Sequence, residues 1–357
     1  MSILSIVIFV LIFSFLVIVH ELGHFWAARL SGVRVEEFGL GLPPRIWGKK
    51  FGETLYSLNG IPFGGFVKLK GEADGSTDKD SMVTKGYGPK LLIMSGGVLM
   101  NFITGYLVLC IGMWLGMPPL ATSPHDLGIE NIKTDVIVFA VEEGYPAQEA
   151  GVMPGDVILE VDGQVIVKIE DLQNAVKGKE EVELIVGRDN EPVALTVGTV
   201  ATDNGEVIGV AAEAIANRVN YPASQVPVYA AQDFGNIFKQ IAIAIGQFAG
   251  RLFTTGTIAS DVAGPIGIAQ ITAHAVELGL LPVLQLIIFL SVNLGLINLF
   301  PFPALDGGRI LFMGIEMVVG KKRVPQNLEN IIHNLGFILL LVLIVVVTYR
   351  DIVRIIG

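Results

Sequence analysis

The sequence of residues 3–30, ILSIVIFVLIFSFLVIVHELGHFWAARL, joins an apolar run to two histidines and a glutamate. The run 3–19 approaches the roughly 20 apolar residues that cross a bilayer core. It passes without a helix breaker into His20-Glu21-Leu22-Gly23-His24, and it lacks the basic start and small-residue cleavage site of a signal peptide. We therefore expect one continuous helix over about residues 3–30, ending near Gly32.

Three further runs are apolar for about the same length, at residues 91–115, 281–300 and 335–348, the last extending to 356. Charged residues make up only 16% of the 357 residues, whereas soluble domains carry about a quarter. The low share of charge is explained if several segments lie in a lipid bilayer. The sequence thus predicts an α-helical polytopic membrane protein with about four transmembrane helices.

Charge and cysteine content exclude other classes of protein. The net charge of −10 argues against a nucleic-acid partner, because phosphate binding needs a basic face. The single cysteine, Cys110, excludes an internal disulfide and a cysteine-based zinc cluster.

Basic residues indicate the orientation, because short loops rich in Lys and Arg stay in the cytoplasm. Residues 29–90 carry many basic side chains, and Lys321, Lys322 and Arg323 form a compact cluster, whereas residues 118–233 are strongly acidic. We expect both basic loops in the cytoplasm, and the acidic segment and both termini outside.

The motif at residues 20–24 indicates metal chemistry. His20 and His24 are four residues apart, so on a helix they project from one face and can bind one ion. Zinc accepts neutral imidazole nitrogens, and a catalytic site keeps one position open for water. Glu21 stands beside them and can take a proton from that water. Ionisable groups at the end of an apolar helix are costly unless they serve a function, so the motif predicts one Zn²⁺ ion with Glu21 as the catalytic base.

A hydrolytic zinc site needs a third protein ligand, and Asp306 is the favoured candidate. It follows the third apolar run, on the membrane side where His20 is expected, within NLFPFPALDGG at residues 298–308. Prolines at membrane depth are tolerated where the backbone is buried or lines a cavity. A simple helix-ending turn would explain the prolines and glycines, but it leaves Asp306 and Asn298 without a purpose. Of the other histidines, His125 lies in the expected outside segment, and His274 and His333 stand alone near the ends of apolar runs and are interpreted as structural.

The two motifs together resemble those of the site-2 protease family of intramembrane zinc metalloproteases, in its bacterial regulator-of-sigma-E protease branch. The family's HExxH matches residues 20–24, and its NxxPxPxLDGG matches residues 298–308 without a gap. Two further stretches resemble family segments, from Gly96-Gly97 to Asn101 and at residues 262–268. The resemblance covers nearly the whole chain.

That resemblance implies a function and a set of site residues. His20, His24 and Asp306 would bind zinc, Glu21 would be the base, and Asn293 and Asn298 match asparagines thought to position the substrate. The substrates would be single-span membrane proteins, such as anti-sigma factors already trimmed outside, or remnant signal peptides. The location would be a bacterial-type inner (cell) membrane, with the active site toward the cytoplasm.

Residues 53–71, within a cytoplasmic β-hairpin region at 33–71, are expected to hold the substrate. Residues 54–58 and 66–70 are typical of strands, with turn residues at 59–60 and 64–65 between them. A hairpin with an open edge could pair with an extended substrate through backbone hydrogen bonds; an ordinary cytoplasmic hairpin gives the same pattern. The family resemblance favours substrate pairing, with these residues as candidates: Tyr56, Ser57, Leu58, Gly64 and Gly65.

Residues 118–225 are expected to form an extracytoplasmic region with a PDZ-like domain at about 127–200. PAQEAGVMPGDVI at residues 146–158 indicates a short helix, a turn and a strand, and residues 169–176 indicate a second helix. This resembles a bacterial PDZ domain, whose groove takes an extended peptide. A passive size filter against bulky substrates needs only volume and position, and the pattern does not separate the two roles. Many relatives carry two such domains, and this chain has room for about one.

The remaining segments complete the expected organisation. Residues 1–117 form the first part of the membrane core, 226–275 an amphipathic helix and connector, and 276–357 the second part. Apolar residues at helical spacing within 233–256 fit a helix on the outer membrane surface or one buried against the outside domain. Two other functions predict different sequences: an inactive PDZ scaffold would show damage to the zinc residues, and a transporter would show internal repeats. The sequence shows neither.

Overall fold

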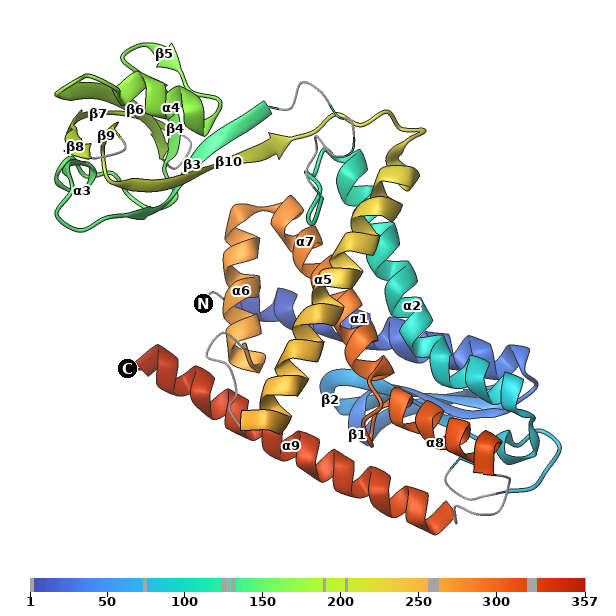
Figure 1. Ribbon diagram of the computed structural model, residues 1–357. Coiled ribbons are helices and arrows are strands. Elements are labelled where there is room, and N and C mark those ends of the chain that lie inside the picture. Colours follow the sequence, from blue (N-terminus) through green and yellow to red (C-terminus); the bar gives the residue numbers. More distant parts are fainter. Residues whose placement is uncertain are drawn as a thin grey trace. The chain divides into compact units, whose positions relative to one another are not determined.

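The structure, a computed structural model, describes residues 3–72, 76–122, 127, 129, 133–188, 191–202, 205–255, 263–319 and 326–356. The chain forms two compact units (Figure 1): Met1–Gly112 with Ala230–Gly357, and Met113–Tyr229. The expected extracytoplasmic region 118–225 falls within the second unit. The predictions that concern His125, Val262 and the basic cluster at 321–323 lie outside the described residues.

Within the described residues, four helices are long and apolar enough to cross a membrane: α1 (Ile3–Leu30), α2 (Tyr87–Trp114), α7 (Leu280–Leu299) and α9 (Gln326–Ile356, apolar over Ile331–Arg354). These are the four predicted runs, and α1 is continuous as expected, with Gly32 just beyond its end at a φ of 64°. That left-handed conformation favours glycine because it has no Cβ.

Helices α1 and α2 approach closely where both carry glycine. A Cβ at Gly23 would lie 2.1 Å from the carbonyl oxygen of Gly96, and a Cβ at Gly96 would lie 2.6 Å from that of Gly23. Small residues let helix backbones approach in this way. The contact brings the backbone of α2 close to the histidines of α1.

The strands β1 (Val35–Phe51) and β2 (Thr54–Leu69) form the sheet of the first unit. The expected hairpin within residues 53–71 is wrong, because residues 54–58 and 66–70 do not pair with each other. Instead β1 lies between them, with Gly39 pairing with both Ser57 and Phe66. The segments therefore lie side by side in the order 45–51, 54–59, 37–40 and 65–69. The expected turns at 59–60 and 64–65 are also wrong, because these residues lie within β2 and the chain turns at residues 52–53. The pairing partner is an earlier strand, which local pattern cannot identify.

The helix α5 (Val226–Thr255) also departs from expectation. Its apolar stripe faces α2: Phe234 packs on Tyr106 and Phe238 on Phe102, with ring centroids 6.1 and 5.4 Å apart. Figure 1 shows α5 beside α2. Neither expected environment, the outer membrane surface or the outside domain, accounts for these contacts.

Two shorter helices were not expected, α6 (Pro265–Leu278) and α8 (Asp306–Val319). The carboxylate of Asp351 in α9 accepts backbone hydrogen bonds from Gly264 and Gly267 at the start of α6, at 3.2 and 2.8 Å. This satisfies N–H groups that a helix start leaves unpaired and joins α6 to α9.

The second unit is built on a sheet in the order β10-β3-β4-β6-β7, with β5 beside β4. Its strands are β3 (Lys133–Val141), β4 (Val157–Val161), β5 (Gln164–Val165), β6 (Glu181–Arg188), β7 (Glu191–Gly198) and β10 (Val210–Arg218). The helices α3 (Pro146–Glu149) and α4 (Ile169–Val176) occur where predicted, and β8 (Val200–Thr202) pairs with β9 (Gly205–Val207). Leu172, Ala175 and Val176 of α4 pack into the sheet's core. Because β10 pairs along β3, the sheet extends beyond the expected limit at residue 200.

Candidate metal centre

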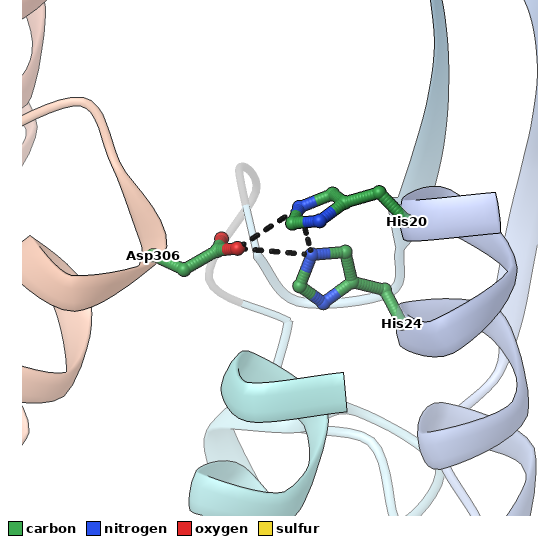
Figure 2. Close-up of side chains that lie close together, drawn as sticks. All are labelled: His20, His24 and Asp306. Carbon is green, nitrogen blue, oxygen red and sulfur yellow. Dashed lines mark hydrogen bonds and ion pairs between the residues drawn. The ribbon is translucent and has the colours of Figure 1, made fainter. Parts of the chain in front are cut away.

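The i, i+4 spacing on α1 brings the imidazoles of His20 and His24 side by side, and α8 supplies a carboxylate opposite them (Figure 2). The Nε2 atoms of the two histidines lie 3.1 Å apart. Oδ2 of Asp306 lies 3.1 Å from Nε2 of His20 and 3.2 Å from Nε2 of His24. The structure thus brings together the three side chains that the sequence predicts as metal ligands.

Backbone contact sets the orientation of His24. Its Nδ1 lies 2.7 Å from the carbonyl oxygen of Ile93 in α2. A carbonyl can only accept a hydrogen bond, so Nδ1 carries the proton and Nε2 keeps its lone pair for a metal.

A glycine of α2 makes room for both imidazoles. A Cβ at Gly97 would lie 2.5 Å from Nε2 of His24 and 2.6 Å from Nε2 of His20. The Gly96-Gly97 stretch singled out in the sequence therefore serves two purposes: one glycine permits the helix contact and the other leaves space at the ligand atoms.

The turn before α8 holds Asp306 in place. Ala304 has a positive φ of 82°, and its N–H donates a hydrogen bond to Nδ1 of His333 in α9 at 3.0 Å. A Cβ at Gly307 would lie 2.2 Å from the carbonyl oxygen of Leu299, so this part of the turn folds tightly against the end of α7. His333 is thus structural, as expected, and it supports the segment that bears a ligand.

Glu21 lines a cavity of about 350 Å³ that also includes His20, His24, Asp306 and Asn298. The backbone N–H of Val67 in β2 donates a hydrogen bond to the Glu21 carboxylate. Arg309 of α8, also at this cavity, forms an ion pair with Glu72 just after β2. The expected base therefore faces the same space as the three ligands.

The two asparagines of α7 differ in position. Nδ2 of Asn298 lies 3.4 Å from Nε2 of His20, whereas Asn293 does not line the cavity. Asn293 and Asn298 are five residues apart, which places them about 140° apart around the helix axis. Asn293 therefore points away from the cavity that Asn298 lines. Of the two asparagines, Asn298 is the one that lies at this centre.

The candidates for substrate pairing also separate. Tyr56, Ser57 and Leu58 pair with β1 on both sides, so they offer no open edge, and their assignment to substrate pairing is wrong. Gly65 pairs with Leu40 on one side, and on the other a Cβ there would lie 3.7 Å from Cγ of Glu21. Gly64 lies beside Val17 of α1. The edge next to the centre is therefore 64–69.

The donor set fits zinc. Two imidazole nitrogens and one carboxylate oxygen are ligands that zinc takes at a three-residue catalytic site. Oδ2 of Asp306 is buried and accepts no hydrogen bond of ordinary geometry, although both Nε2 atoms lie within 3.2 Å. A cation bound among these atoms would satisfy all three. His20, His24 and Asp306 are the group of three within the described residues whose ligand atoms converge in this way.

Comparisons with known proteins agree with this chemistry. The model of peptidase family M50 matches residues 8–343. A Clostridium perfringens protein named as a zinc metalloprotease is 35% identical, covering 97% of this chain and 98% of that protein. Zinc metalloprotease RasP of Shouchella clausii is 27% identical over 96% of this chain and 97% of its own length. Among solved structures, the PDZ domain of an SdrC-like protein from Listeria innocua matches at 26% identity, covering 22% of this chain and 92% of that one. The TM-score of this match is 0.20, which is too low to indicate a shared fold.

Proposed function

Because this chain belongs to peptidase family M50 and is a zinc metalloprotease of the site-2 protease type, we propose that it hydrolyses peptide bonds in or near transmembrane segments of other proteins. The observation that carries this proposal is the convergence of His20, His24 and Asp306 beside Glu21, with three of the four residues on an apolar helix long enough to span a membrane.

The residues divide the chemistry as follows. His20, His24 and Asp306 would hold the zinc, which when bound would polarise a peptide carbonyl and lower the pKa of a water molecule. Glu21 takes the proton of the attacking water and returns it to the leaving amine as the C–N bond breaks. Asn298 donates a hydrogen bond to the substrate backbone, and the surrounding helices limit access of bulk water.

The edge of β2 next to the centre is the proposed holder of the substrate. A substrate helix must unwind before hydrolysis, and an extended backbone can pair with an open strand edge. Residues 64–69 form that edge, with Gly64 and Gly65 at its start beside α1. Main-chain pairing supports tolerance of varied substrate sequences.

The proposed substrates are single-span membrane proteins. Membrane-anchored regulators of the anti-sigma-factor kind and remnant signal peptides both offer one apolar helix with little folded mass around it. The setting is a bacterial-type cell membrane with the centre toward the cytoplasm, supported by the basic residues between the first two apolar helices.

The second unit has two candidate roles on the outer side of the membrane. As a PDZ-like domain it could bind an extended peptide in its groove, or it could exclude substrates with bulky outside domains. The short helix α3, the strand β4 and the helix α4 occur where the PDZ resemblance expects them.

The test compares the native protein with Glu21→Gln in detergent, using a model single-span substrate and measuring bound zinc. We expect equal zinc and a loss of cleavage of roughly 10²- to 10⁴-fold, as for removal of a general base. Glu277→Gln on α6, where the side chain is exposed, is the matched control and should cleave normally. Cleavage by Glu21→Gln at the native rate, or a native protein without zinc, would contradict the proposal.

A further inference from the structure

Asn101 of α2 contacts His20 on the side away from the other ligands. Its side chain is fully buried, and its Nδ2 lies 3.2 Å from Nδ1 of His20. Its Oδ1 is buried without a hydrogen-bond partner. A buried amide with an unsatisfied oxygen at a functional centre requires an explanation.

The orientation of this amide decides which nitrogen of His20 can bind a metal. If Nδ2 donates to Nδ1, the imidazole proton must sit on Nε2, and Nε2 then has no lone pair to offer. If the amide is rotated by a half turn, Oδ1 accepts from a protonated Nδ1, and Nε2 is free to bind zinc. A half turn exchanges the positions of the amide oxygen and nitrogen, which are nearly the same size. The choice between the two orientations therefore rests on the chemistry of the partners.

That chemistry favours the rotated amide. Nε2 of His20 is the atom that faces Asp306 and His24, so it must carry a lone pair in the zinc-bound state. We infer that Asn101 is a positioning residue: its Oδ1 accepts a hydrogen bond from Nδ1 of His20 and thereby holds Nε2 in the tautomer that binds zinc. This inference rests on the proposed role of His20 as a zinc ligand.

Asn101 also contacts a third helix through its backbone. Its backbone oxygen accepts a hydrogen bond from the hydroxyl of Ser291 in α7 at 2.7 Å, and the Ser291 side chain is also fully buried. One residue of α2 thus links the ligand helix α1 to α7. The two histidines are held differently, His24 by a backbone carbonyl and His20 by a side chain, so only the second support can be removed by mutation.

The experiment measures zinc affinity by competition with a chelator in the detergent-purified full chain. Asn101→Leu removes the acceptor at similar volume and should weaken zinc binding roughly 10- to 100-fold, as is usual for groups that orient a ligand. Asn101→Asp retains an acceptor and should bind zinc within about threefold of the native protein, because carboxylate–histidine pairs are common around zinc. A merely structural role predicts the reverse for Asn101→Asp, since it buries a new charge.

Two reference variants distinguish a failure of this inference from a failure of the proposed ligand set. Ser291→Ala removes the hydrogen bond to the backbone oxygen of Asn101 and leaves the side-chain amide of Asn101 unchanged. The zinc affinity of this variant should therefore stay near native. His20→Ala should lose the site, and if it binds zinc normally, the proposed ligand set is wrong rather than the role of Asn101. The visible spectrum of the cobalt-substituted protein should change in Asn101→Leu and match the native one in Asn101→Asp. If Asn101→Leu fails to fold, the Asn101→Asp affinity decides.

Native affinity in a folded Asn101→Leu, or loss of affinity of tenfold or more in a folded Asn101→Asp, would overturn the inference.

Discussion

At the scale of single residues, Gly97 is the position at the metal centre that has no room for a side chain. The imidazoles of His20 and His24 occupy the space where a side chain at this position would begin. A contact of 2.5 Å is far inside the normal separation of nonbonded heavy atoms. Either ring would have to leave its position, and the convergence with Asp306 would be lost.

We therefore expect Gly97→Ala to abolish stoichiometric zinc binding while leaving the protein folded. The added methyl group lies against the ligand atoms, whereas Ala is a better helix former than Gly, by about 1 kcal/mol. Bound zinc is measured by mass spectrometry after gel filtration. Gly88→Ala, also in α2 but with no atom within 4 Å of the added Cβ, is the control and should bind one zinc. Full zinc in Gly97→Ala would show that the centre is arranged differently.

At the scale of elements, the sheet of the first unit presents one edge to the centre. Val67 illustrates its geometry: it pairs with Phe38 of β1 on one side, and its N–H reaches Glu21 of α1 on the other. Because backbone groups alternate in direction along a strand, the other outward N–H and C=O groups of 65–69 remain available to a substrate, whereas the N–H of Val67 is taken by Glu21.

We expect Val67→Pro to lower the cleavage rate, because proline removes the N–H that holds the Glu21 carboxylate while sparing the hydrogen bonds to β1. The loss should be roughly fivefold, the equivalent of about 1 kcal/mol for one hydrogen bond. Cleavage of the single-span substrate is measured together with bound zinc, which should equal that of the native protein. Val67→Ala keeps the N–H and should cleave normally; native cleavage by Val67→Pro would show that this N–H does not position Glu21.

At the scale of the whole molecule, the second unit carries its own buried charge pair. The Asp156 carboxylate, 1% exposed, accepts hydrogen bonds from Nε and Nη2 of Arg188 at 2.8 and 2.7 Å and from the N–H of Met153 at 2.9 Å. Burial alone would raise the pKa of this carboxyl, but the Arg188 guanidinium and the Met153 N–H outweigh it and lower the pKa below the ordinary 3.8. A lowered pKa means that the ionised carboxylate stabilises the folded unit above about pH 3.8, and that this stability is lost as the pH falls through the lower folded value.

We expect Asp156→Asn to reduce the free energy of unfolding of this unit by about 2 kcal/mol at pH 7, as for loss of hydrogen bonds to a charged group. The difference should shrink as the pH falls below 3.8. Hydrogen exchange of peptides from β4 and β6, measured on the full chain, reports it. Asp162→Asn, whose ion pair with Lys179 is solvent-exposed, should change exchange less. A difference that stays constant with pH would mean that the charge of Asp156 does not stabilise the unit.

The sequence by itself determined the features that depend on local spacing. The four apolar helices follow from the lengths of their runs, and the pairing of His20 with His24 follows from the helical repeat. Asp306 was identified because prolines and glycines around a carboxylate make little sense in an ordinary helix end. Each of these signals lies within about one element of the chain.

Only the tertiary structure decided which distant segments meet. It placed Asn101 against His20 across 81 residues of sequence. It also showed that Asn298 lines the cavity at the metal centre and Asn293 does not. It moved Tyr56 from the expected edge to the interior of the sheet, because β1 inserted between two parts of β2. It set the stripe of α5 against α2. Periodicity shows that a face is apolar or an edge is a strand, but the partner is selected by packing among all elements at once, and no local pattern encodes that choice.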